Sequence, residues 1–121
     1  MPSSRRSSSP EVAALRTAAE GSRKQLLDQA RQHARLIRSG AVGELTEADV
    51  KRMAEDIIAA ARARLDAAAP RPQSLSTDPE LQATRQGADE IMTTAAREAD
   101  AVLLKAWRAR HDEGAGRRWH R

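Results

Sequence analysis

Histidines are the first residues to consider for chemistry, because the chain has no cysteine and only His33, His111 and His120. No helical spacing relates these three, and neither a His-Glu-x-x-His nor a Glu-x-x-His pattern occurs. Zinc and di-iron sites on helices depend on such patterns, so the sequence predicts no metal ion and no cofactor. His33 falls on an apolar stripe, where a lone histidine is more often a packed core residue than a ligand, and its role is left open.

Acidic pairs are the remaining candidates for acid–base catalysis. Glu55 and Asp56 are adjacent in sequence, as are Asp89 and Glu90. Adjacent helix positions point about 100° apart, so neither pair converges on one substrate atom. The segment 40–43 contains two glycines but lacks the lysine and the preceding strand of a phosphate-binding loop. The sequence therefore predicts a protein that is not an enzyme.

Basic residues give a stronger indication of binding. The chain carries 21 Lys and Arg against 17 Asp and Glu, and both of its ends are basic. Contacts to an anionic partner are predicted for Arg5, Arg6, Arg117, Arg118, Trp119 and Arg121. A second set shares much of one face of the first predicted helix: Arg16, Arg23, Lys24, Arg31 and Arg35. This set is either a phosphate-facing stripe or a solvated face of helix-favouring residues.

Three consecutive apolar residues near the carboxyl end suggest another contact. Val102, Leu103 and Leu104 span about 200° of a helix, which is more than one packing face uses. Either the chain's own helices cover a central third helix on two sides, or a partner protein covers the excess. For the second case the predicted partner contacts are Leu103, Leu104 and Trp107.

Apolar periodicity predicts the elements that position these residues. The fold class is all-α, with three long helices at about 11–39, 47–69 and 79–112 in an up-down-up bundle or elongated hairpin. Residues 11–113 form one domain. Flexible basic arms are expected at 1–10 and 114–121.

Helix-end signals support these boundaries. Thr46 and Asp49 resemble a capping box at the start of the second helix. The predicted stops are Gly40 for the first helix, Pro70 and Pro72 for the second, and Gly114 for the third.

The composition predicts a thin core. Alanine occurs 25 times, whereas Leu, Ile and Val together number 18, and there is no Phe or Tyr. The larger apolar residues concentrate at the end of the bundle that holds the first turn, and the opposite end is expected to be nearly all alanine. Alanine contacts bury little area, so a partner would add needed stability.

These observations favour a non-catalytic structural or adaptor subunit of a larger protein assembly, homo- or hetero-oligomeric. The alternative is a small accessory nucleic-acid-binding protein that uses the basic arms and the arginine-rich first helix. No membrane partner is expected, because no apolar run approaches the 18 residues of a membrane span. The paired arginines near the start precede no apolar run, so a cytoplasmic location is predicted.

Overall fold

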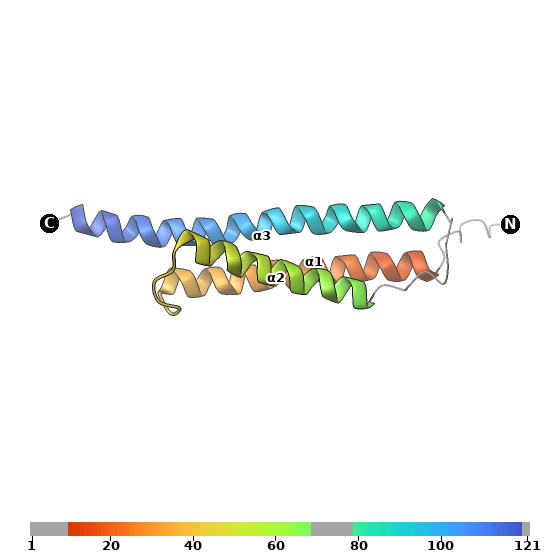
Figure 1. Cartoon of the computed structure of the whole chain (residues 1–121), viewed down its shortest axis with the longest axis horizontal. Coiled ribbons are helices and arrows are strands. Elements are labelled where there is room, and N and C mark those ends of the chain that lie inside the picture. The colour runs from red at the N-terminus through yellow and green to blue at the C-terminus, as the bar shows by residue number, and fades with distance from the viewer. Residues whose placement is uncertain (1–9, 69–78, 120–121) are drawn as a thin grey trace.

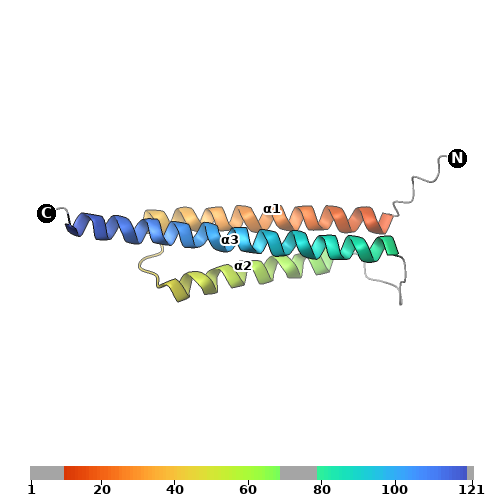
Figure 2. The same cartoon turned by 90° about the horizontal axis from the view of Figure 1, so that it is seen from above.

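The computed structural model describes residues 10–68 and 79–119, with side chains described as far as Asp112. The helices are α1 Pro10–Ser39, α2 Glu47–Ala68 and α3 Pro79–Trp119. α1 and α3 run side by side in the same direction, and α2 runs in the opposite direction beside them (Figure 1, Figure 2). No strand occurs in these ranges. The predicted all-α, up-down-up bundle of three helices is confirmed.

The end of α3 differs from the sequence prediction. The helix continues through Gly114 to Trp119, so the end expected near Asp112 is too early. Glycine inside a helix costs about 1 kcal/mol relative to alanine but does not forbid the conformation. No proline follows it, and Ala115, Arg117 and Arg118 belong to strongly helix-favouring residue types. The resulting helix of 41 residues is about 62 Å long.

The carboxyl end of α1 is closed by a Schellman motif. The Gly40 amide donates to the carbonyl oxygen of Ile37 at 3.2 Å, and the Ala41 amide donates to that of Leu36 at 3.1 Å. Gly40 has a φ of 79°, a conformation that glycine adopts without steric cost. The predicted stop at Gly40 is confirmed, and the motif satisfies two carbonyl groups that the helix leaves without partners.

The amino end of α2 is closed by the predicted capping box. The Thr46 amide donates to Asp49 Oδ2 at 2.9 Å, and the Asp49 amide donates to Thr46 Oγ1 at 3.1 Å. The hydrogen bond from the Thr46 amide, aided by the Thr46 hydroxyl, holds the pKa of the Asp49 carboxyl below its usual range, because both favour the ionised form. Both ends of the short 40–46 connection are therefore fixed by local hydrogen bonds.

The buried face of α3 has a regular spacing of three, four and four residues, which suits a nearly straight helix. Its buried residues are, in order, Leu81, Thr84, Ala88, Met92, Ala95, Ala99, Leu103 and Ala106. One larger side chain thus recurs every eleven positions, with smaller ones between. The same core includes Ala19, Ala30 and Ala34 of α1, and α1 and α3 make most of the contacts between helices.

The core reaches both ends of the bundle. Val12 is fully buried, and Leu15 and Leu81 are 4% exposed, although all three lie at the end opposite the 40–46 connection. The expectation that this end is nearly all alanine is wrong. The expectation missed the few large side chains that α1 and α3 contribute at this end, because these residues are far apart in the sequence.

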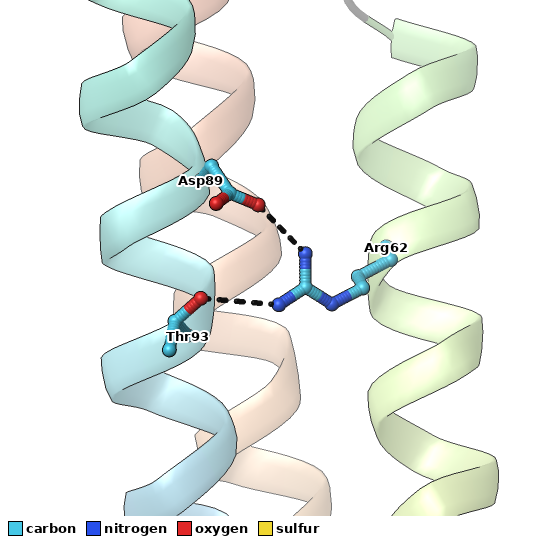
Figure 3. Close-up of polar contacts among 3 residues, drawn as sticks. All are labelled: Arg62, Asp89 and Thr93. Atoms are coloured by element: carbon cyan, nitrogen blue, oxygen red, sulfur yellow. Dashed lines mark hydrogen bonds and ion pairs between the residues drawn. The ribbon is translucent and has the colours of Figure 1, made fainter.

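Helix α2 also makes polar contacts across the bundle surface. The Arg62 guanidinium donates to Asp89 Oδ1 at 3.2 Å and to Thr93 Oγ1 at 3.4 Å, both on α3 (Figure 3). The Asp89 side chain is 70% exposed, so solvent weakens the ion pair. The contact fixes the orientation of α2 more than it stabilises the bundle.

The capping box predicts a measurable loss on substitution. Thr46→Ala should lower the free energy of unfolding by about 1 kcal/mol, because the Asp49 amide loses its acceptor. Urea unfolding followed by circular dichroism measures the change. Thr17→Ala is the matched control, since Thr17 is exposed within α1 and alanine favours helix there. Equal losses in the two variants would contradict this role for Thr46.

The lowered pKa of the Asp49 carboxyl predicts that the stability of the protein depends on pH. Because its pKa is lower in the folded chain, the carboxylate stabilises α2 above the ordinary value of 3.8, and this contribution is lost as the pH falls through the lower folded value. Asp49→Asn should therefore lower the melting temperature at neutral pH, and the gap to the wild type should shrink in acid. In a Thr46→Ala background the Asp49→Asn gap at neutral pH should be only partly reduced, because the hydroxyl is lost while the backbone amide remains. A gap that widens in acid would refute the assignment.

Candidate interaction surface at the turn end of the bundle

We call the end of the bundle where the 40–46 connection meets α3 the turn end. Trp107 joins the two segments, since its indole Nε1 donates to the carbonyl oxygen of Leu45 at 2.6 Å. Both side chains are half-buried and pack against the core. A buried indole normally finds an acceptor, and here the acceptor lies in the connection. Trp107 therefore attaches α3 to the turn between α1 and α2.

His111 covers the outer side of this contact. It lies one helical turn after Trp107, and the two rings stack with centroids 4.3 Å apart and planes 30° apart. The imidazole is exposed. The stack widens the aromatic surface at the turn end without forming a pocket for a reacting group.

Arg110 contacts the end of α1. Its guanidinium Nη1 donates to the carbonyl oxygen of Arg38 at 3.3 Å, where the partial negative charge of the helix end favours a cation. The same guanidinium lies against Gly40, so closely that a Cβ at that position would collide with it. The backbone conformation requires glycine at this position, whereas the exposed end of Arg110 could move aside for a Cβ.

Of the predicted partner contacts, Leu103 lies in the core, and Leu104 and Trp107 lie at its edge. Leu103 is fully buried, whereas Val102, Leu104 and Trp107 are half-buried and pack against the core. α3 lies against both α1 and α2, which explains why three consecutive apolar residues find cover in one chain. Leu103 is thus unavailable to a partner while the bundle is intact. Leu104 lines a shallow depression of about 480 Å³ on α3, and its contact with a partner stays a prediction.

Two apolar residues missed by the sequence reasoning are exposed at the turn end. Leu36 is 42% exposed and Val42 is 37% exposed, and they are the exposed large hydrophobic residues among those described. Leu36 precedes the end of α1 and Val42 lies in the connection. A signal was present, because a hydrophobic contact often accompanies the Schellman motif. Their exposure, however, depends on the direction in which the connection leaves α1.

The predicted anionic contacts are only partly described. Arg5, Arg6 and Arg121 lie outside the described residues. Arg117, Arg118 and Trp119 belong to the last turns of α3, where the structure gives the course of the helix alone. Beyond Arg110 the helix runs past the end of α1 without a neighbour among the described elements (Figure 1). The basic residues near the carboxyl end therefore belong to a projecting helix.

The described residues bring no metal site together. Across residues 10–68 and 79–112 no three His, Cys, Asp or Glu side chains lie close enough to hold a metal ion. His33 is half-buried on α1. Within the helices of the described part, none has the length and apolar character needed to cross a membrane.

The geometry defines an all-α three-helix bundle with one locked turn end and a projecting helix. Comparison with protein-family models, curated protein sequences and solved structures finds no match for this chain. Its function is therefore argued from its own surfaces.

Replacing each of three glycines by alanine should change the stability in opposite directions. Gly40→Ala should destabilise the protein by about 1 kcal/mol, because its φ is 79° and the exposed Arg110 guanidinium can move aside for a Cβ. Gly43→Ala should cost a similar amount, since its φ is 77° and nothing lies near its Cβ. Gly21→Ala, in open space within α1, should stabilise by about 0.5 to 1 kcal/mol. Thermal unfolding measures the series, and no loss of stability in Gly40→Ala would contradict the requirement for a positive φ.

Proposed function

We propose that this protein is a non-catalytic structural or adaptor subunit that binds another protein chain at its turn end. The observation that carries the proposal is the location of the exposed apolar residues. Leu36 and Val42 both lie at the end where α3 leaves the bundle. A projecting helix beside an exposed apolar pair offers a partner both area and an anchor.

The rigidity of the turn end supports this proposal. The connection carries a Schellman motif at one end and a capping box at the other. Trp107 attaches α3 to the connection, and Arg110 attaches α3 to the end of α1. A surface that is already ordered loses little conformational entropy on binding, which favours affinity.

The thin core supports a role within an assembly. Nine of the 20 buried hydrophobic residues are alanine, and each alanine contributes little apolar area. The end of α3 that extends past α1 and α2 gains no packing from them. Association would bury such a helix and add the stability that the chain supplies only sparingly itself.

A second candidate is an accessory nucleic-acid-binding protein. The specific observation in its favour is the exposed basic face of α1, which lies away from the apolar pair. This candidate requires an anionic polymer as partner, whereas the adaptor requires an apolar surface. Salt affects the two differently, because charge contacts weaken in salt and apolar contacts do not.

The adaptor proposal predicts a specific loss of assembly. In an extract of its native cell the protein should migrate in a complex heavier than its own 13.2 kDa, and Leu36→Gln with Val42→Gln should return it to the free chain. Native size-exclusion chromatography with light scattering measures both. The control replaces exposed Ala59 and Ala60 of α2 by Gln, which adds the same amide groups elsewhere. A wild-type chain that migrates alone, or a complex unchanged by the turn-end variant, would refute the adaptor proposal.

A further inference from the structure

The solvent face of α1 gathers six cations. Each of them is exposed, and at about 100° per residue they fall within roughly 120° of the helix circumference. They are Arg16, Arg23, Lys24, Arg31, Arg35 and Arg38. From Arg16 to Arg38 the row extends about 33 Å along a single helix. We call this surface the α1 basic face.

Most of these charges have no ionic partner in the described part of the chain. Arg31 pairs with Asp28 at 3.6 Å, and both side chains are more than half exposed, so the pair contributes little. None of the other five lies within 4.0 Å of a described carboxylate, although Glu20 shares the face. Unpaired like charges at helical spacing repel one another. A bound polyanion would relieve that repulsion.

Packing fixes the direction in which this face points. About 100° around α1 from the centre of this face, Val12, Leu26 and Ile37 are buried in the core, so the helix cannot turn about its axis. Leu27 falls near the middle of the face by helical angle and is itself only 4% exposed. The cations therefore stand on a rigid support and are presented together to solvent.

The α1 basic face lacks an apolar anchor. The exposed large hydrophobic residues of the described chain are Leu36 and Val42, and Leu36 lies about 160° around the helix from Arg38. A protein partner usually needs a buried apolar anchor, and a membrane-bound helix needs an apolar face to insert. Neither is available here, so charge alone must recognise the partner.

We propose that the α1 basic face binds the phosphate backbone of a nucleic-acid duplex without reading its sequence. Guanidinium groups match phosphate oxygens in pairs, and five of the six cations are arginine. The row of about 33 Å is close to one turn of B-form DNA, about 34 Å, so a straight helix lying along the duplex can contact phosphates on both sides of a groove. The proposal rests on the second candidate function and is independent of the turn end.

Salt-dependent binding tests the proposal on the full chain. Fluorescence anisotropy with a labelled random-sequence duplex of about three turns gives the affinity at several sodium chloride concentrations. In the face variant, Arg16, Arg23, Arg31 and Arg38 are all replaced by Gln, which favours helix. The slope of log affinity against log salt should become shallower by about 3 to 4, since each lost phosphate contact removes about 0.9.

A charge-matched variant controls for the net loss of four positive charges. It replaces exposed Arg52, Arg85, Arg97 and Lys105 of α2 and α3 by Gln. Its slope should stay within about 1 of the wild type, because these residues lie off the face. Circular dichroism checks the fold, and if the fourfold face variant unfolds, the doubles Arg16→Gln with Arg23→Gln and Arg31→Gln with Arg38→Gln should each give about half the change in slope.

Three outcomes distinguish binding by the α1 basic face from nucleic-acid binding by the protein in general. A wild-type chain that does not bind duplex at low salt overturns both the α1 basic face and the nucleic-acid candidate. Binding that the face variant and its control reduce equally overturns the assignment to α1 and leaves the candidate function standing. Displacement of the duplex by poly-glutamate at equal charge concentration would make the partner an acidic protein and overturn the proposal.

Discussion

Small side chains line the contact between α1 and α3, and the position of every other element follows from it. The two helices run in parallel and supply most of the contacts between helices. Alanine at Ala19, Ala88 and Ala95 permits a close approach, while Leu26, Met92 and Leu103 fill the space that remains. With so few large residues, a straight and continuous seam is how this chain buries enough surface. The large buried side chains of α3 recur every eleven residues, and this spacing keeps them on one side of the helix.

Helix α2 closes this pair and depends more on polar contacts. Its interface includes the exposed Arg62 pair, and Arg64 has Nε and Nη2 buried without a hydrogen-bond partner in the described chain. A buried donor left unsatisfied costs about 1 to 3 kcal/mol, so α2 is held less tightly than the α1 and α3 pair. The locked turn end compensates, because Trp107 donates to Leu45 of the connection and Arg110 donates to Arg38 at the end of α1.

The three-helix bundle carries two surfaces with different chemistry. The turn end exposes Leu36 and Val42 beside a projecting helix, and the α1 basic face exposes cations without an apolar anchor. A protein chain suits the first surface, and a polyanion suits the second. Around α1 they face different directions, since Leu36 lies about 100° from Arg35 and about 160° from Arg38.

Local signals by themselves determined the three helices, the stop at Gly40 and the capping box of Thr46 and Asp49, because these depend on residues a few positions apart. The stop predicted at Gly114 was wrong, since glycine weakens a helix without ending it. Only the tertiary structure decided that Leu103 is core, that Trp107 donates to Leu45, and that Leu36 is exposed. Burial and hydrogen bonding between distant residues depend on which helix faces meet, and periodicity along one helix does not specify its neighbour.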